Sequence, residues 1–115
     1  MLQPNCIIPD GESLSVEATA FAARNPGLAL EISDEIRGRV AASRKLLDEF
    51  VASGRIIYGV TTSVGGFVNW LVPAARASTV QNNILRAVQS NVGPDLDDDY
   101  VRAAMLARIN SLGRG

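Results

Sequence analysis

The stretch VASGRIIYGVTTSVGGF, residues 51–67, contains the end of a helix, a short extended segment and the start of a loop. Gly54 stands where the preceding helical pattern stops, a position that favours glycine because the chain can turn left-handed there. The β-branched and aromatic residues 56–58 predict a short strand. Residues 59–73 show no sustained periodicity and include two adjacent glycines, so they predict a long loop. Long loops without structure of their own usually act as lids or binding segments.

Helical patterns flank this stretch on both sides. Ser15 has the character of an N-cap, and Asn25-Pro26-Gly27 is a strong stop signal. Acidic residues open the second and last helices, where carboxylates favour the positive end of the helix dipole, and Ser78 is the expected cap of the third. A short strand is expected within residues 28–32. We therefore expect a mainly α protein, one domain over 1–115 with a lid loop over about 59–73; the expected helices span about 15–24, 34–53, 78–91 and 97–112.

Composition excludes several classes of function. The chain has 115 residues, of which 47% are hydrophobic and 20% charged, and its net charge is -1. No basic cluster is dense enough for a nucleic-acid interface. Cys6 is the single cysteine and there is no histidine, so the chain holds no internal disulfide and no histidine-based catalytic group. Consecutive aspartates on a helix point in different directions, so Asp97, Asp98 and Asp99 predict no metal site.

Targeting signals are not evident in the sequence. No apolar run approaches the ~20 residues of a membrane-spanning helix. The start MLQPNCIIPDG lacks the charged beginning and long apolar core of a signal peptide. The expected compartment is therefore the cytoplasm, with no membrane partner.

Two longer motifs carry a family resemblance. IYGVTTSVGGF (57–67) and VQNNILRAVQSNVGPDLDDDYVRAAMLARINSLGRG (80–115) resemble the N-terminal part of the aromatic amino acid ammonia-lyases and aminomutases. These enzymes depend on the electrophile 4-methylideneimidazole-5-one (MIO). SVGGFV and QNNILRAV are most similar to bacterial phenylalanine aminomutases and to related lyases of natural-product biosynthesis. The resemblance implies the N-terminal helical segment of the ammonia-lyase fold, with short strands and a catalytic lid loop.

The resemblance also implies roles for four residues. Tyr58 matches the catalytic tyrosine, which removes a proton from the β-carbon of the substrate. Gly65 matches the loop glycine that lies against the substrate amine, where a missing side chain permits close approach. Ala87 and Val88 match the pair that lines the aromatic ring, and the first of these is a histidine in tyrosine-selective relatives. Ser63 and Val64 stand where many lyases have Gly-Phe. Arg86, directly before the pair, is unusual, so a substrate with a polar or charged ring stays an open alternative.

The electrophile itself is not expected on this chain. In the family, MIO forms from an Ala-Ser-Gly triad that lies well downstream of the tyrosine loop, beyond the point that corresponds to Gly115. Ala52-Ser53-Gly54 is better explained as a helix end capped by glycine. The resemblance therefore implies the small component of a divided lyase or aminomutase. That component is inactive alone and forms a hetero-oligomer on a tetrameric core, and its partner chain supplies MIO.

The alternative is a non-catalytic helical assembly partner or a truncated relic of the scaffold. The intact tyrosine loop favours the catalytic component, because a chain retained only for packing would not need both Tyr58 and Gly65. Lyase and aminomutase chemistry, and the identity of the aromatic amino acid, stay open.

Overall fold

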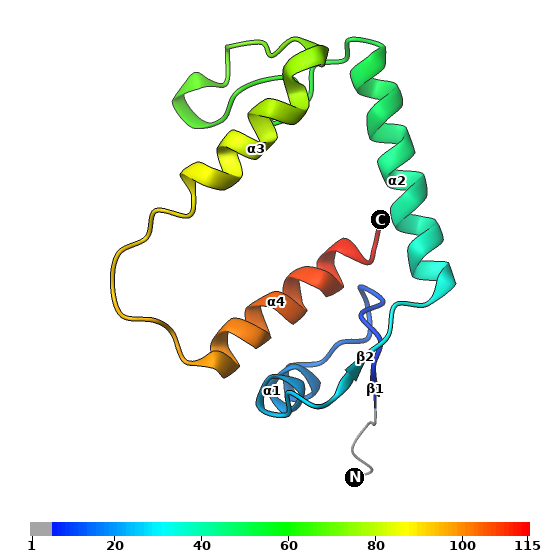
Figure 1. The fold of residues 1–115 in the computed structure, drawn as a ribbon. Helices are drawn as coiled ribbons and strands as arrows, with labels where there is room; N and C mark the ends of the chain where they lie inside the picture. The colour runs from blue at the N-terminus through cyan, green and yellow to red at the C-terminus, as the bar shows by residue number, and fades with distance from the viewer. Residues whose placement is uncertain (1–5) are drawn as a thin grey trace. The chain divides into compact units, whose positions relative to one another are not determined.

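The computed structural model describes residues 6–115, which divide into two compact units. The first contains the chain up to Arg44 together with Asp95–Gly115, and the second is Lys45–Pro94. That these units form one domain stays a prediction. Helices dominate both units (Figure 1), so the chain is mainly α, as expected. Within residues 6–115 no helix is both long and apolar enough to cross a membrane.

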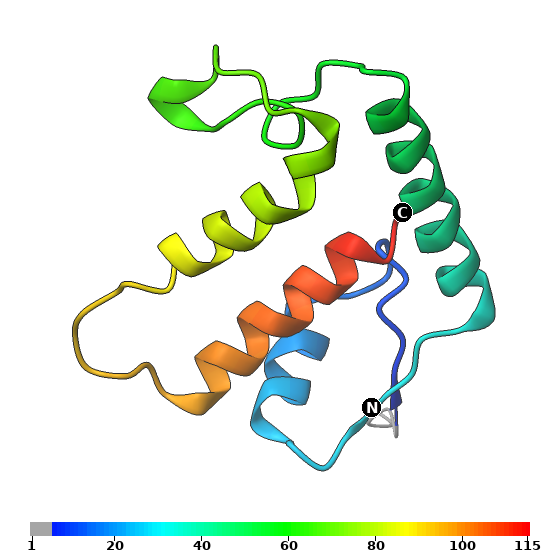
Figure 2. The same cartoon turned by 45° about the horizontal axis from the view of Figure 1, so that its top comes forward.

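The first unit contains two helices that pack against each other and a very short parallel sheet. Strands β1 (Cys6–Ile7) and β2 (Ala29–Leu30) pair in parallel. Helix α1 (Val16–Arg24) lies against α4 (Asp98–Leu112), and Figure 2 shows the same pairing from a second angle. The buried apolar side chains of this unit are Ile7, Pro9, Ala23, Ile36 and Leu106, of which Pro9 is fully buried.

Helix starts in this unit follow local sequence signals. The Ser15 hydroxyl accepts a hydrogen bond from the Ala18 N–H at 3.1 Å and caps α1, the role expected from the sequence. At the other end, the Asn25 side chain donates to the Phe21 carbonyl at 2.7 Å. Both contacts satisfy backbone groups that a helix end would otherwise leave without partners.

Helix α2 (Asp34–Ala52) runs from the first unit into the second and ends in a glycine cap. Gly54 has φ +74°, the Gly54 N–H donates to the Val51 carbonyl at 3.1 Å, and the Arg55 N–H donates to the Phe50 carbonyl at 3.0 Å. This pair of bonds is the Schellman motif, in which a left-handed glycine terminates a helix. Gly54 therefore caps α2, as its position in the sequence suggested.

The strand expected over residues 56–58 is not formed. Tyr58 begins a turn, and residues 55–57 have no strand partner in the described chain. The Ile57 N–H donates instead to the Thr61 hydroxyl at 2.8 Å. A strand needs a neighbouring strand to satisfy its backbone groups, so β propensity alone was insufficient here.

The lid loop has more internal structure than its sequence suggested. It contains the short 3₁₀ helix η1 (Gly65–Phe67) and an antiparallel bridge between Thr62 and Leu71. The Ser63 N–H donates to the Trp70 carbonyl at 2.9 Å, and the Val72 N–H donates to the Thr61 carbonyl at 2.8 Å. These bonds close the loop at its base.

Helix α3 (Ala77–Ala87) follows the 3₁₀ helix η2 (Ala74–Arg76) without a side-chain cap. The expected cap Ser78 lies inside α3 instead, because the preceding 3₁₀ turn already opens the helix. The helix ends before the expected residue 91. The Ser90 hydroxyl donates a hydrogen bond to the Ala87 carbonyl at 2.9 Å. Serine side chains can in this way take a carbonyl that a backbone N–H would bond in a continuing helix.

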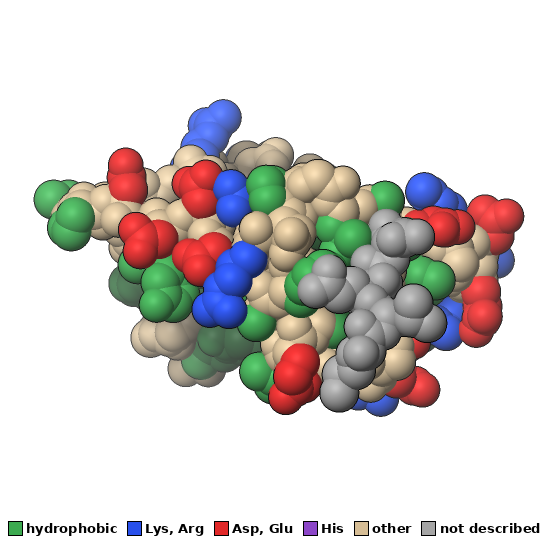
Figure 3. Space-filling view, turned by 90° about the horizontal axis from the view of Figure 1, so that it is seen from below, with side chains coloured by type: hydrophobic (Ala, Val, Ile, Leu, Met, Phe, Trp, Pro, Cys, Tyr) green, Lys and Arg blue, Asp and Glu red, His purple; other side chains and the backbone are tan. Residues whose placement is uncertain are grey.

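Many large apolar side chains of the described chain are exposed. On the face that Figure 3 shows, positive and negative side chains are interspersed, and hydrophobic side chains lie between them. Exposed large apolar residues occur on each of α1, α2, α3 and α4. Examples are Val16, Leu46, Leu85, Val101, Met105 and Leu112.

Candidate functional site

The structure joins two of the four expected site residues. Tyr58 lies in the turn at the base of the lid, with 64% of its surface exposed. Its phenol oxygen accepts a hydrogen bond from the Gly65 N–H at 3.3 Å, across seven residues of sequence. Gly65 has φ +60°, a left-handed conformation that favours glycine, and it is the first residue of η1. The lid therefore turns back so that its glycine meets its tyrosine.

This contact is relevant to base chemistry. A backbone N–H is an acceptable donor for a developing anion because it is fixed by the fold before any reaction occurs. The Gly65 N–H is in that position relative to the Tyr58 oxygen.

Two buried threonines hold the backbone on either side of Tyr58. The Thr61 hydroxyl accepts from the Ile57 N–H at 2.8 Å and donates to the Arg55 carbonyl at 2.8 Å. The Thr62 hydroxyl accepts from the Gly59 N–H at 3.1 Å. Their exposed fractions are only 7% for Thr61 and 4% for Thr62. Sequence reasoning missed both residues, although threonines directly after a turn often bond nearby backbone groups.

A third supporting contact comes from helix α3. The Gln81 side-chain amide, through Nε2, donates to the Gly59 carbonyl. Gln81 lies one turn into α3 and is half-buried. It links the turn that carries Tyr58 to α3, the helix that ends at Ala87 and Val88, the pair predicted to line the aromatic ring.

Ala87 and Val88 lie at the far end of α3 from that contact. Ala87 is the last helical residue and Val88 is the C-cap. Six residues separate Gln81 from Ala87, which corresponds to ~9 Å along a helix axis. Within residues 6–115 no hydrogen bond joins either residue to Tyr58 or Gly65. The pair and the tyrosine are therefore on one unit but are not in direct polar contact.

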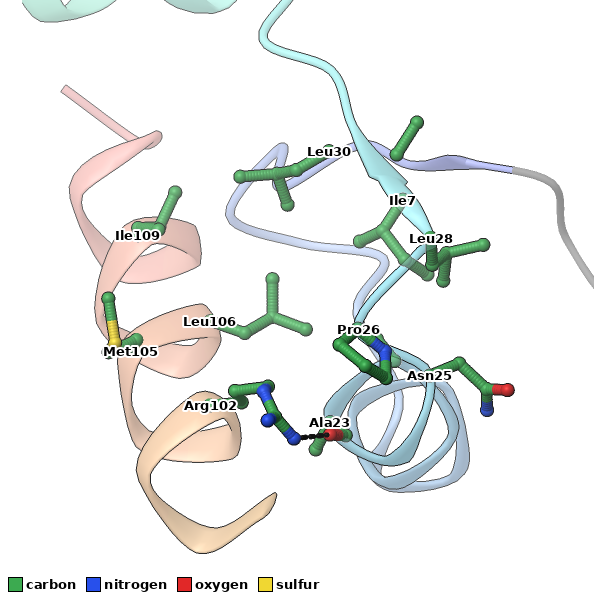
Figure 4. A pocket seen from close by; sticks show the side chains of 12 residues that line it. Ile7, Ala23, Asn25, Pro26, Leu28, Leu30, Arg102, Met105, Leu106 and Ile109 are labelled. Carbon is green, nitrogen blue, oxygen red and sulfur yellow. Dashed lines mark hydrogen bonds between the residues drawn. The ribbon is translucent and has the colours of Figure 1, made fainter. Parts of the chain in front are cut away.

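Three apolar cavities of the described residues lie away from the predicted site. The largest, of about 600 Å³, belongs to the first unit, with Pro9 and Leu112 among its walls. Another, of about 180 Å³, lies between α1, β2 and α4, with Ile7, Leu30 and Leu106 among its walls (Figure 4). Arg102 also lines this cavity, and its guanidinium donates hydrogen bonds to the Ala23 carbonyl at 3.1 Å and to the Asp98 carboxylate at 2.7 Å. This cavity is a packing gap of the first unit rather than a site with free polar groups.

The third cavity, of about 300 Å³, belongs to the second unit. Its walls include Val51, Ile56, Thr61 and Leu71. None of the four predicted site residues lines any of these cavities. All four are exposed, so these cavities do not enclose a substrate beside Tyr58.

The local geometry of Ala52-Ser53-Gly54 does not fit an MIO group. Cyclisation requires the Gly54 nitrogen to attack the Ala52 carbonyl. In the structure Ala52 is helical, and the Gly54 N–H is engaged with the Val51 carbonyl at 3.1 Å. The triad is a helix cap and supplies no electrophile. Among the described residues there is also no group of histidine, cysteine and acidic side chains that could hold a metal ion.

Comparison with known proteins gives a consistent set of relatives. A family model for aromatic amino acid lyases matches residues 14–115. Histidine ammonia-lyase of Streptococcus sanguinis is 42% identical over 106 residues, which are 92% of this chain and 20% of that protein. The chain thus spans about a fifth of the length of the curated relatives that it matches.

Solved structures agree with the sequence relatives. A phenylalanine aminomutase from Pantoea agglomerans is 50% identical with a TM-score of 0.85, and the match covers 96% of this chain and 21% of that one. A tyrosine aminomutase from Streptomyces globisporus is 29% identical with a TM-score of 0.87, covering 95% of this chain and 20% of the other. The matched region is the N-terminal portion of a fold whose enzymes depend on MIO. The chain therefore belongs to the aromatic amino acid lyase family.

Proposed function

We propose that this chain contributes Tyr58 as the catalytic base of a composite active site. The site eliminates ammonia from an aromatic amino acid or shifts its amino group from the α- to the β-carbon. The chain is the small component of the enzyme, and a second chain carries the rest of the lyase fold. The observation that carries this proposal is the hydrogen bond from the Gly65 N–H to the Tyr58 phenol oxygen.

The chemical step assigned to this chain is a proton transfer. The Tyr58 phenolate oxygen takes a proton from the substrate β-carbon and becomes a phenol. The electron pair of the broken C–H bond forms the carbon–carbon double bond as the amine leaves the α-carbon. The Gly65 N–H is the backbone donor that faces this oxygen. The exposed position of Tyr58 suits this role, since its ring stays open to a substrate held by other parts of the enzyme.

MIO belongs to the second chain in this proposal. The group supplies an electrophile that makes the substrate amine a better leaving group. Ala52-Ser53-Gly54 is a helix cap, which supports a source elsewhere in the fold. The exposed apolar side chains of the described helices support a partner that covers them, and the family's tetrameric core is its proposed framework. A cytoplasmic location remains a prediction from the sequence.

Ala87 and Val88 are the proposed contacts of the aromatic ring. Alanine offers no hydrogen bond to a ring hydroxyl, so an unsubstituted ring is favoured over a phenol. The 50% identity to a phenylalanine aminomutase, against 29% to a tyrosine aminomutase, supports the same preference. Arg86 precedes this pair, and a polar or charged ring is the alternative that this residue keeps open.

The test uses complementation. The full chain is co-expressed with the Pantoea agglomerans phenylalanine aminomutase from which the matched N-terminal fifth has been removed. Release of the arylacrylate and formation of the β-amino acid from L-phenylalanine are then measured. Loss of a general base costs ~10²–10⁴ in rate, so Tyr58→Phe is expected to reduce turnover by that factor.

The chain provides its own matched control. It has two tyrosines, and the second, Tyr100, is an exposed residue of α4 in the other unit. Tyr100→Phe is expected to keep wild-type turnover. A Tyr58→Phe complex that works within a few-fold of wild type contradicts the proposal. Equal activity of all three complexes instead supports the alternative, a chain that only completes the scaffold.

A further inference from the structure

Both polar groups of one lid residue are held by side chains. The Gly59 N–H donates to the Thr62 hydroxyl at 3.1 Å, and the Gly59 carbonyl accepts from Gln81 Nε2. Thr62 is within the lid, whereas Gln81 comes from α3, 22 residues further along the chain. The backbone next to Tyr58 is therefore fixed from two directions.

The tyrosine side chain itself has little support. Its ring is 64% exposed, and the hydrogen bond from the Gly65 N–H is long at 3.3 Å. Packing therefore contributes little to the placement of the ring, and the backbone on either side fixes the point from which the Tyr58 side chain leaves the chain. On the preceding side the Ile57 N–H is held by Thr61, and on the following side Gly59 is held by Thr62 and Gln81.

Of these three side chains, Gln81 alone comes from outside the loop. Thr61 and Thr62 can tie the turn to itself, but they cannot place it relative to the helix that ends in Ala87 and Val88. Gln81 lies on that helix, ~9 Å along the axis from Ala87. Its amide therefore connects the turn that carries the proposed base, Tyr58, to the helix that carries the proposed ring contacts, Ala87 and Val88.

We propose that Gln81 is a positioning residue, whose amide anchors the Gly59 carbonyl to α3 and thereby sets where the lid presents Tyr58. This inference rests on the proposed function for its catalytic consequence. Its structural part, the anchoring of the lid, depends only on the observed contact. Gln81 touches no reacting atom and acts through the backbone beside Tyr58.

The first arm of the test measures the lid in the full chain. Gln81→Met keeps the length of the side chain and removes the amide. We expect amide hydrogen exchange over residues 57–62 to accelerate about two- to tenfold, the range for loss of one net hydrogen bond. Gln89→Met is the matched control, because Gln89 is exposed and lies beyond the end of α3, and it should leave this exchange unchanged.

Gln81→Glu adds a signature that a general loss of stability would not produce. Its carboxylate cannot donate to the Gly59 carbonyl, but the protonated acid can. The lid should therefore loosen at neutral pH and tighten again as the pH falls through ~4–5, the range for a glutamate. Trp70 is the single tryptophan and lies in the lid, so its fluorescence anisotropy follows this change. Gln89→Glu is expected to show no such step.

The second arm measures turnover of L-phenylalanine in the complemented complex. Misplacement of the base affects the transition state more than substrate binding, so Gln81→Met should lower kcat about tenfold with KM little changed. Unchanged lid exchange in the full chain overturns the anchoring role, whatever the turnover. Faster exchange with wild-type kcat overturns the positioning role. A wild-type complex without turnover overturns the proposed function and the catalytic part of this inference, while the exchange arm still decides the anchor.

Discussion

Substitution of Gly54 tests whether Ala52-Ser53-Gly54 is a helix cap. A Cβ at Gly54 would meet no atom within 4 Å, so the cost of Gly54→Ala comes from its φ of +74° and not from a clash. Left-handed backbone costs a non-glycine residue about 1–2 kcal/mol. Reduced freedom of the unfolded chain returns about 0.4–1 kcal/mol. The net expectation is that Gly54→Ala destabilises the end of α2 by about 1 kcal/mol.

Gly38 is the matched control on the same helix. It lies within α2, its φ is not left-handed, and a Cβ there also meets no atom within 4 Å. Gly38→Ala should therefore stabilise α2 by about 1 kcal/mol, the helix-propensity difference between the two residues. The two variants should thus differ by about 2 kcal/mol, a factor of ~30 in the equilibrium for unfolding.

Amide hydrogen exchange along α2 measures both effects in the full chain, since it reports local opening even where the chain associates. Equal protection of the Gly54→Ala variant and the wild type would refute the cap argument. Intact-mass measurement provides an independent check. We expect the mass of the unmodified sequence, and a chain lighter by two water molecules, one lost on cyclisation and one on dehydration of Ser53, would show that the triad forms an electrophile after all.

Four further outcomes are expected. Ala87→His should shift relative kcat/KM in the complemented complex towards tyrosine over phenylalanine, because the imidazole offers a hydrogen-bond partner to the ring hydroxyl of tyrosine; an unchanged ratio places Ala87 outside the pocket. Leu106→Ala should lower stability by about 2–4 kcal/mol, measured by thermal unfolding, because Leu106 is buried in the first unit. The pKa of Asp10 is lowered to about 2 by hydrogen bonds from the Ser13 hydroxyl and from the backbone N–H groups of Ser13 and Glu12. The ionised carboxylate therefore stabilises this turn above pH 3.8, and that stabilisation is lost as the pH falls towards 2. Hydrogen exchange of the Ser13 amide should rise over the same pH window, and Asp10→Ala should remove this pH dependence. Expressed alone, the chain should self-associate in light scattering through its exposed apolar side chains, and a monodisperse monomer would contradict this.

Features that depend on near neighbours along the chain could be predicted from the sequence. Ser15 caps α1 and Gly54 ends α2 because a cap is made by residues within four positions of the helix end. Motif spacing identified the family that the comparisons then confirmed. Where a local signal depended on a partner, as for the strand over residues 56–58, it was insufficient, and the pairing of β1 with β2 was missed for the same reason.

How the candidate site is held depends on the tertiary structure. Tyr58 and Gly65 are seven residues apart, and nothing in their spacing shows that the loop turns back to join them. Burial of Thr62 and the contact of Gln81 with Gly59 depend on the path of the lid over α3. A hydrogen bond between residues far apart in the sequence requires the chain between them to form a closed loop. Closing that loop costs conformational entropy of the chain, which other contacts in the fold must offset. Residue types therefore indicated which chemistry was possible, and the fold determined which groups could take part in it.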